Sequence, residues 1–361
     1  MNRWFAAFLA ITTIGLLAGC KGDSGKPGGG TSAAATTTQA SGPALNVYIW
    51  SEYLPESVVK RFTERTGIPV NLDFYDINDV ILEKLQSGVA DYDIVVPSDY
   101  MVRTLIQQKL LQPIDKSKLP HFSSLDPKFL DQEFDKGNAH SVPYLWGLTG
   151  LGYNKTKVEG KVDSWDVLFD ERYKNQICML DDMRECFAVA LRRMGKSINE
   201  TDPAVLAQAA EMLKKQVPLV KLYNSDDFAG KLAAGDVWVS HGYTGQLAKL
   251  AHEDPRFVVV MPKEGGTVAV DNLCIPASSK RAEMAHKFMD FVMEPENAAE
   301  IANGTVYASP NIPAKKLINP ELLNDPNIYP PDDVLKRCEF MRDVGDATPT
   351  YERLWAEVKG G

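Results

Sequence analysis

The sequence predicts an α/β protein whose folded part consists of two similar lobes joined by a hinge. Short runs rich in Val, Ile and aromatic residues alternate with longer segments of helical period, once before residue 100 and again after residue 176. Two extended segments, 140–158 and 270–279, suit chain crossings between these halves. Because two crossings join the two lobes, we expect a hinge between them.

The first half is predicted to run strand, helix, strand, helix, strand. Its first helix has Pro55 in the first turn and ends at Gly67, which are favoured residues at those positions. The second helix has Val80, Ile81 and Leu85 on one side. The predicted elements are strand 46–50, helix 54–67, strand 69–76, helix 77–88 and strand 92–98.

The second half repeats this alternation. A helix at 202–216 follows its first strand, and the helix-patterned stretch 280–304 is expected to pack on a lobe that is already formed. The predicted strands are 177–182, 219–224, 236–242 and 257–262. Neither a repeat of solenoid period nor a sustained heptad pattern occurs, so the sequence favours a globular fold.

The N-terminal part of the sequence predicts export and a lipid anchor. Residues 1–20 combine Arg3, a short apolar run and the ending "LAGC", the pattern of a bacterial lipoprotein signal in which Cys20 is lipidated. A buried helix is the alternative, but we find no sequence that would pack against it. Residues 21–43 are rich in Gly, Ser, Thr and Ala, which predicts a flexible tether.

The remaining chain is long enough for two lobes with cores of their own. We expect lobe 1 to consist of residues 44–147 with 271–317, and lobe 2 to consist of residues 148–270 with 318–361. We expect the protein to be a monomer.

The net charge of −9 argues against a nucleic-acid partner, because Lys and Arg nowhere cluster with aromatic residues. An acidic chain tolerates cationic ligands instead. Four cysteines besides Cys20 would enter an oxidising compartment after export, and the sequence leaves three pairings and free thiols open. These cysteines are Cys178, Cys186, Cys274 and Cys338.

The sequence has no motif that predicts an enzyme, a metal site or a cofactor site. It lacks G-x-S-x-G, P-loop, H-E-x-x-H and C-x-x-C motifs, and the glycines of "GLTGLG" are spaced wrongly for a dinucleotide fingerprint. The five histidines are scattered along the chain. We expect no catalysis, metal or cofactor; the enzyme alternative is acid/base chemistry by Asp182 and Glu185.

Aromatic and carboxylate side chains recur together where predicted strands end. In open α/β sheets ligands bind beyond the carboxyl ends of the strands. The polar and aromatic residues at these ends are Trp50, Ser51, Glu52, Tyr53, Ser98, Asp99, Tyr100, Asp182, Glu185, Tyr243 and Asp271. Each has a structural alternative, and Asp182 would cap the helix that contains Glu185. Their coincidence favours a ligand, because carboxylates in a cleft are costly to dehydrate unless a cation offsets them.

An organic ammonium ion matches this combination of residues. Aromatic faces pack on a methylene chain and attract an adjacent cation, at about 0.5–2 kcal/mol per contact. Carboxylates accept charge-assisted hydrogen bonds from its N–H groups. A diamine or triamine meets both requirements.

At these residues the chain resembles the periplasmic spermidine/putrescine-binding proteins, the solute receptors of polyamine ABC importers. The similarity runs collinearly from about Ala44 to Lys359. Its motifs are "YIWSEYLP", "FTERTGIPV", "YDIVVPSDY", "IDKSKL", "SVPYLWG", "LDDMRECF", "MPKEGG", "NLCIPA" and "YPPDD". The resemblance implies a type II periplasmic-binding-protein fold, with two α/β lobes that close on the ligand about a hinge.

The resemblance implies roles for the residues that match these motifs. Trp50 and Tyr53 match an aromatic wall, with Ser51 as a hydroxyl beside it. Glu52 falls where putrescine-preferring members have an acid. A second contact loop is matched by Ser98 and Tyr100.

Other matches concern the amine anchors. Asp182 and Glu185 match an acidic pair that receives an amine, and Asp271 matches the main acidic anchor. Tyr243 falls where the family usually has Trp, and Tyr307 matches a tyrosine near the pocket.

The chain departs from the family pattern at several positions. Ala269 replaces a large aromatic residue, and Met341, followed by Arg342, stands where spermidine-preferring members have a glutamine. Gln246 replaces an acid of putrescine-preferring relatives. Because the acids persist while the walls change, we expect amine binding with an altered preference.

These observations predict a function and a location. We expect an extracytoplasmic receptor, periplasmic or on the outer cell surface, that binds a polyamine-like cation and delivers it to an ABC permease. Cys20 would hold it on a membrane through lipid chains. A receptor that reports polyamines to a membrane signalling protein is the alternative.

Overall fold

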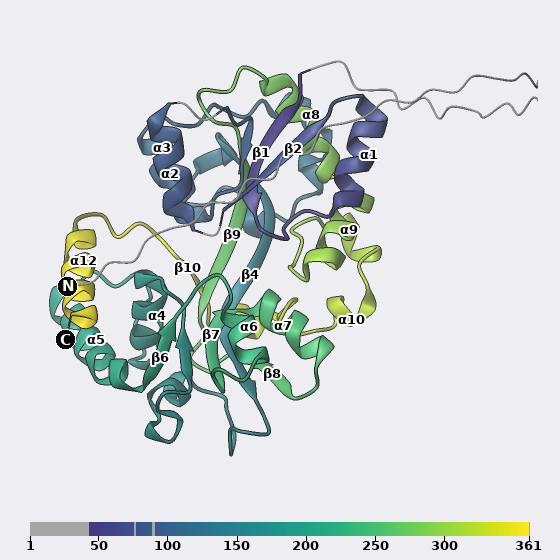
Figure 1. Cartoon of the computed structure of the whole chain (residues 1–361). Coiled ribbons are helices and arrows are strands. Elements are labelled where there is room, and N and C mark those ends of the chain that lie inside the picture. The colour runs from purple at the N-terminus through teal and green to yellow at the C-terminus, as the bar shows by residue number, and fades with distance from the viewer. Residues whose placement is uncertain (1–42, 76, 89–90, 361) are drawn as a thin grey trace, which may run out of the picture. The chain divides into compact units, whose positions relative to one another are not determined.

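The protein was analysed as a computed structural model that describes residues 43–75, 77–88 and 91–360 (Figure 1). The predicted signal segment 1–20 with Cys20, and the predicted tether up to residue 42, lie outside the described residues. No helix in the described ranges is both long enough and apolar enough to cross a membrane.

The first half of the chain forms the predicted alternation of strands and helices. Gly67 and Gly88 end the first two helices in the left-handed conformation (φ 71° and 68°), where glycine lacks the strain of a Cβ atom. The elements are β1 (Leu45–Trp50), α1 (Glu56–Thr66), β2 (Val70–Tyr75), α2 (Asn78–Ser87), β3 (Ile94–Val95) and α3 (Asp99–Gln107). Strand β1 pairs in parallel with β2 and β3. Strand β3 is shorter than predicted because Pro97 has no N–H group to continue the ladder.

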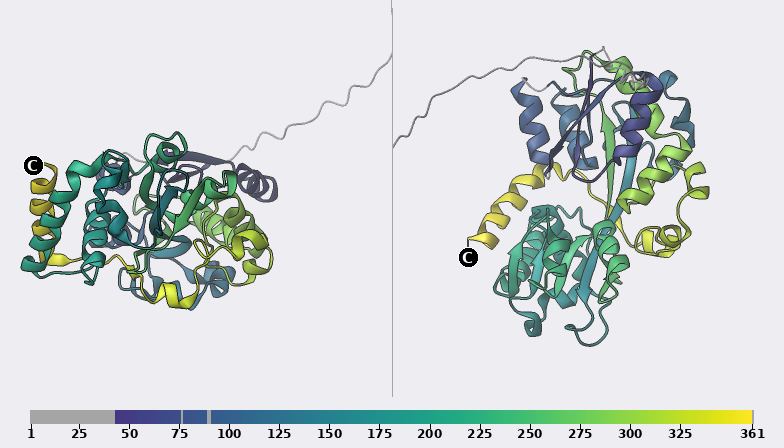
Figure 2. Two further views of the ribbon diagram at one scale, coloured as in Figure 1. Left: turned by 90° about the horizontal axis from the view of Figure 1, so that it is seen from below. Right: turned by 45° about the vertical axis from the view of Figure 1, so that its right-hand side comes forward.

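Two long antiparallel strands connect the halves of the sheet. They are β4 (Ser141–Asn154) and β9 (Thr267–Cys274), which pair from Ser141↔Cys274 to Leu148↔Val268. Beyond this pairing, β4 continues alongside the strands of the second half. Figures 1 and 2 show β4 and β9 running side by side between the two halves. The predicted crossings are therefore sheet strands.

The second half contains a second set of strands with helices beside it. Strand β4 is followed across the sheet by β7, β5 and β6 in that order, while β8 pairs with β4 on its own. The elements are β5 (Ile177–Met179), α4 (Met183–Arg193), α5 (Pro203–Gln216), β6 (Val220–Tyr223), α6 (Phe228–Ala233), β7 (Val239–Tyr243), α7 (Thr244–Glu253) and β8 (Phe257–Val260). The predicted α/β alternation is confirmed in both halves.

Helical segments complete the fold. The helix-patterned stretch 280–304 forms two helices, because Pro295 starts a new helix where the first has ended. The remaining elements are α8 (Ala282–Val292), α9 (Pro295–Thr305), α10 (Pro320–Leu323), α11 (Asp332–Leu335), β10 (Glu339–Phe340) and α12 (Thr348–Lys359). Short 3-10 turns lie at 116–118, 120–124, 127–129, 136–138, 165–169, 171–173, 217–219, 313–316 and 345–347.

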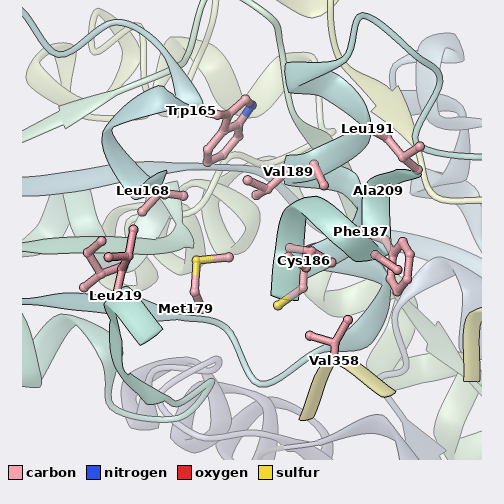
Figure 3. Packing of buried hydrophobic residues seen from close by; sticks show 14 of the residues in the cluster. Trp165, Leu168, Met179, Cys186, Phe187, Val189, Leu191, Ala209, Leu219 and Val358 are labelled. Atoms are coloured by element: carbon pink, nitrogen blue, oxygen red, sulfur yellow. The ribbon is translucent and has the colours of Figure 1, made fainter. Parts of the chain in front are cut away.

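Separate apolar clusters lie in the two halves. One gathers Val47, Phe62 and Phe288, and another surrounds Trp165 and Phe187. Figure 3 shows the second cluster, whose labelled residues are Trp165, Leu168, Met179, Cys186, Phe187, Val189, Leu191, Ala209, Leu219 and Val358. Each large side chain that is fully buried stabilises the fold by about 1.5–3 kcal/mol. The cysteines whose pairing the sequence left open are free thiols: Cys178, Cys186, Cys274 and Cys338.

Candidate ligand-binding site

A cavity opens where strand ends of both halves meet beside β4 and β9. It is lined by all the predicted ligand-binding residues except Glu52, namely Trp50, Ser51, Tyr53, Ser98, Tyr100, Asp182, Glu185, Tyr243, Asp271 and Tyr307. Trp50 and Tyr243 end β1 and β7, Asp271 belongs to β9, and the other residues follow β1, β3, β5 or α9. The rule that ligands bind beyond the carboxyl ends of strands therefore locates the cavity.

Asp271 is held by two hydroxyl groups from the first half. Tyr53 donates a hydrogen bond to its Oδ2 atom over 2.6 Å, and Ser98 donates to its Oδ1 atom over 2.7 Å. Burial raises the pKa of Asp271 to about 6, although these hydrogen bonds favour the ionised form. The carboxylate is therefore fixed in position, and no Lys or Arg is among the described residues that line the cavity around it.

Asp182 and Glu185 lie on the opposite side, at the start of α4. Asp182 caps this helix by accepting a hydrogen bond of 3.0 Å from the main-chain N–H of Glu185. Burial and, to a smaller extent, the neighbouring Glu185 raise the pKa of Asp182 to about 6. Capping and ligand binding are thus compatible, because the cap uses one carboxylate oxygen.

Glu185 is only 4% exposed and has few partners. The Thr267 hydroxyl donates to its Oε2 atom over 3.2 Å, and Nε2 of the fully buried His241 lies 3.7 Å from the same atom. Both of these neighbours lie at the same oxygen atom of Glu185.

Aromatic rings form the walls of the cavity. Tyr53 and Tyr307 meet edge to face with centroids 5.1 Å apart, and the Trp50 indole is anchored by a hydrogen bond of 2.9 Å to the Val96 carbonyl. Only glycine fits at position 245 beside the Tyr307 ring, because a Cβ atom there would lie 2.8 Å from the ring. These contacts hold flat apolar faces next to the carboxylates.

The backbone before Tyr307 is strained. Val306 ends α9 with φ 61°, a left-handed conformation that is costly for a β-branched residue, by about 1–3 kcal/mol. This conformation turns the chain so that Tyr307 lines the cavity. Strain of this kind is typical of functional sites.

Glu52 is the one predicted residue that the structure does not bring to this cavity. Its side chain is 81% exposed and forms an ion pair of 2.9 Å with Lys249 Nζ. Both residues line a neighbouring hollow, which shares Ser51, Asp226 and Gln246 with the cavity.

Several cavity residues were not predicted as ligand-binding residues. Asp99 is the most notable, because it is a second acid from the first half and is only 2% exposed. Its position between Ser98 and Tyr100 at a strand end was the signal that could have identified it. Other such residues are Asn78, Gly147, Leu148, Ser225, Asp226, Gln246, Thr267, Ala269 and Met341.

The charge of the cavity has one sign. None of the described residues that line the cavity is Lys or Arg. Five of them are acids, namely Asp99, Asp182, Glu185, Asp226 and Asp271. Within the part of the chain that the structure describes, no group of three His, Cys, Asp or Glu side chains could hold a metal ion. The arrangement favours an elongated organic cation with several N–H donors.

Comparison with known proteins agrees with this geometry. A family model described as bacterial extracellular solute-binding protein matches residues 57–329. The spermidine/putrescine-binding periplasmic protein of Salmonella typhimurium is 40% identical over 319 residues, 88% of this chain and 92% of that protein. These relatives are solute-binding proteins and not enzymes, as the sequence predicts.

Solved structures are similar over the same part of the chain. A putative spermidine/putrescine ABC transporter from Listeria monocytogenes has a TM-score of 0.82 at 36% identity, covering 88% of this chain and 98% of that one. The spermidine/putrescine substrate-binding protein PotD from Streptococcus pneumoniae has a TM-score of 0.80 at 32% identity, covering 88% and 99%. The two-lobed periplasmic-binding-protein fold is confirmed, and the chain belongs to the family of bacterial extracellular solute-binding proteins.

Proposed function

We propose that this protein binds a polyamine in the cavity and delivers it to an ABC permease. The observation that carries the proposal is a cavity with buried carboxylates on both sides, Asp271 and Glu185 among them, and no Lys or Arg among its described lining residues. A polyamine supplies the missing positive charges, because its amino groups are protonated at neutral pH.

The electrostatic balance supports an ammonium ligand over a neutral one. Asp182 and Asp271 both have a pKa raised to about 6 by burial, so each ionised carboxylate is destabilised in the empty cavity. An ammonium ion would offset this penalty through charge-assisted hydrogen bonds. A neutral ligand would leave the penalty in place.

The walls support a ligand with a methylene chain. Trp50, Tyr53 and Tyr307 present aromatic faces that bind methylene groups and attract adjacent cations. The similar proteins described above carry spermidine and putrescine in their names, which supports the same ligand class for this chain.

The two lobes would close on the ligand. We propose residues 44–147 with 271–317 as one lobe and 148–270 with 318–361 as the other. Separate apolar clusters and the two connecting strands β4 and β9 support this division. Closure about β4 and β9 would bring Asp271 and Glu185 to opposite ends of one ligand.

A lipid anchor would keep the receptor near its permease. The "LAGC" ending at Cys20 and the tether 21–43 support attachment to a membrane outside the cytoplasm. We expect the receptor to act as a monomer.

Calorimetric titration of residues 44–361 tests this proposal. Putrescine, cadaverine, spermidine and spermine are titrated separately, with butane-1,4-diol as an uncharged control. At least one amine should bind and also raise the unfolding temperature, since a ligand at a hundred times its Kd adds about 2.7 kcal/mol of stability. Failure of every amine in both measurements would refute the proposal.

A further inference from the structure

The segment between β10 and α12 contacts both proposed lobes. Residues 341–343 belong to proposed lobe 2, and they lie close to α3 of lobe 1, which carries Arg103. They line a hollow to which lobe 1 contributes Tyr100, Arg103 and Glu133. Tyr100 and Met341 line both this hollow and the ligand cavity, so these two side chains lie between them.

The main chain on both sides of Met341 is bound by one amide side chain of lobe 2. Asn199 donates a hydrogen bond of 2.9 Å from Nδ2 to the Phe340 carbonyl, and its Oδ1 atom accepts one of 2.7 Å from the main-chain N–H of Arg342. Arg184 donates to the Arg342 carbonyl over 3.0 Å and to Asn199 Oδ1 over 3.2 Å. Lobe 2 therefore fixes the main chain before and after Met341.

The Met341 side chain also packs on lobe 2. It is only 6% exposed and forms an apolar cluster with Ala188 and Ile198, against which Tyr100 of lobe 1 packs from the other side. Met341 thus reaches the cavity wall from lobe 2, and the ring beside it comes from lobe 1. The contact between these two side chains changes whenever the lobes move relative to each other.

The side chains that follow Met341 reach lobe 1 in two ion pairs. Nε of Arg342 lies 3.4 Å from Oε2 of Glu133, and Nε of Arg103 lies 3.1 Å from Oδ2 of Asp343. Lobe 2 contributes a cation followed by an acid, and lobe 1 contributes the matching acid and cation. We call these four charged residues the interlobe clasp.

Local stability does not account for the interlobe clasp. The Arg342 and Glu133 side chains are 58% and 54% exposed, and exposed ion pairs contribute little to the stability of a fold. The main chain at this place is already held by Asn199 and Arg184. Weak contacts of this kind have a large effect where two arrangements differ little in free energy, because a few-fold change in the equilibrium constant then changes the populations.

We propose that the interlobe clasp holds the two lobes together and keeps Met341 beside Tyr100, so that closure of the lobes completes this wall of the cavity. The inference rests on the proposed function, since it assumes that the lobes close on a ligand, whichever solute that is. None of the four clasp residues is among the residues that line the ligand cavity. They act as positioning residues, through the lobes and not through contact with the ligand.

Release of the best-binding polyamine tests the interlobe clasp in the full chain. Tryptophan fluorescence in a stopped-flow instrument follows release, because Trp50 lines the cavity. We expect Arg342→Gln to accelerate release about three- to fivefold, and Arg103→Gln/Arg342→Gln about tenfold or more, because release must separate the lobes that these ion pairs join. The association rate constant should stay within about twofold of wild type.

A charge swap separates the interlobe clasp from other effects of these substitutions. Glu133→Arg places two cations together and should accelerate release at least as much as Arg342→Gln. Glu133→Arg/Arg342→Glu restores opposite charges and should return the rate to within about twofold of wild type. Arg193→Gln is the matched control, because its ion pair of 2.6 Å with Asp166 lies entirely within lobe 2, and its release rate should equal that of wild type.

The outcomes distinguish the two proposals. If amines bind but the clasp variants release them at the wild-type rate, or if the charge swap releases them as fast as Glu133→Arg, only this inference is overturned. Asp343→Asn breaks the second ion pair and replaces any clasp variant that does not fold. If no amine binds, the proposed function fails, and small-angle X-ray scattering decides the inference. Arg103→Gln/Arg342→Gln should then have a larger radius of gyration than wild type, and an equal radius overturns the inference.

Discussion

The Tyr53 hydroxyl donates a hydrogen bond of 2.6 Å to Asp271, so an aromatic wall and an acidic anchor of the cavity are one unit. Tyr53 follows β1 and Asp271 lies on β9, and the two residues are 218 positions apart in the chain. The ring also packs edge to face on Tyr307. The Asp271 carboxylate therefore lies beside the aromatic wall that Tyr53 and Tyr307 form.

Replacing Asp271 should remove the main anchor for an amine. We expect Asp271→Asn to raise the Kd of the best-binding polyamine more than tenfold, because a charge-assisted hydrogen bond in a buried site is lost. Calorimetry measures the change. Tyr53→Phe is the control, since it keeps the ring and the charge but removes the hydroxyl, and its effect should be smaller. Equal affinity in Asp271→Asn and wild-type protein would contradict the assignment.

Amine affinity should depend on pH near 6. Asp182 and Asp271 have pKa values of about 6 in the ligand-free protein, so both lose their charge as the pH decreases below this value. We expect the Kd to rise about tenfold or more between pH 7 and pH 5, with proton release on binding near pH 6. Titrations in buffers of different ionisation enthalpy measure both quantities.

The stability of the ligand-free protein should respond to pH in the opposite direction. Because the pKa values of Asp182 and Asp271 are higher in the folded protein than the ordinary value of 3.8, these groups stabilise the fold most at low pH. That contribution is lost as the pH rises through about 6. Denaturant unfolding at several pH values measures this change, and the double variant Asp182→Asn/Asp271→Asn is the control. A wild-type stability profile as flat as that of the variant would refute the expectation.

Much of the fold could be predicted because it depends on local patterns. Strand composition, helical period and the glycines that end α1 and α2 are all visible in the sequence. The length of β3 and the division of 280–304 into two helices were missed. Both depend on prolines, Pro97 and Pro295, whose effect on pairing or helix continuity is decided by the neighbouring structure.

The cavity was predicted less completely, for physical reasons. The polar and aromatic residues at predicted strand ends include about half of the residues that line the cavity. Asp99 was not predicted as a ligand-binding residue and Glu52 was, because residue type does not show which way a side chain points. Alternation of side chains and helix geometry decide that Asp99 faces inward, while a left-handed backbone (φ 57°) accompanies the outward position of Glu52. Neither orientation can be derived from residue types alone.

A large aromatic residue at position 269 should rebuild a wall of the cavity. Ala269 lines the cavity and pairs with Gly147, so that part of β9 and β4 has no large side chain. We expect Ala269→Trp to lower the Kd of putrescine about tenfold through stacking on its methylene chain and attraction of its ammonium groups. Ala269→Leu adds apolar volume without an aromatic face and should have a smaller effect. Unchanged or weaker binding by Ala269→Trp would mean that the open space serves another part of the ligand.

Replacing Glu52 should have little effect on ligand binding. Its exposed carboxylate already pairs with Lys249 of α7 over 2.9 Å, and exposed ion pairs contribute at most about 1 kcal/mol. Glu52→Gln should therefore change the Kd of putrescine less than about fivefold. If the ion pair only links the two sides of the neighbouring hollow, Lys249→Gln should change this Kd by the same factor. A loss as large as that of Asp271→Asn, without a matching loss in Lys249→Gln, would mean that Glu52 leaves Lys249 and binds the amine directly.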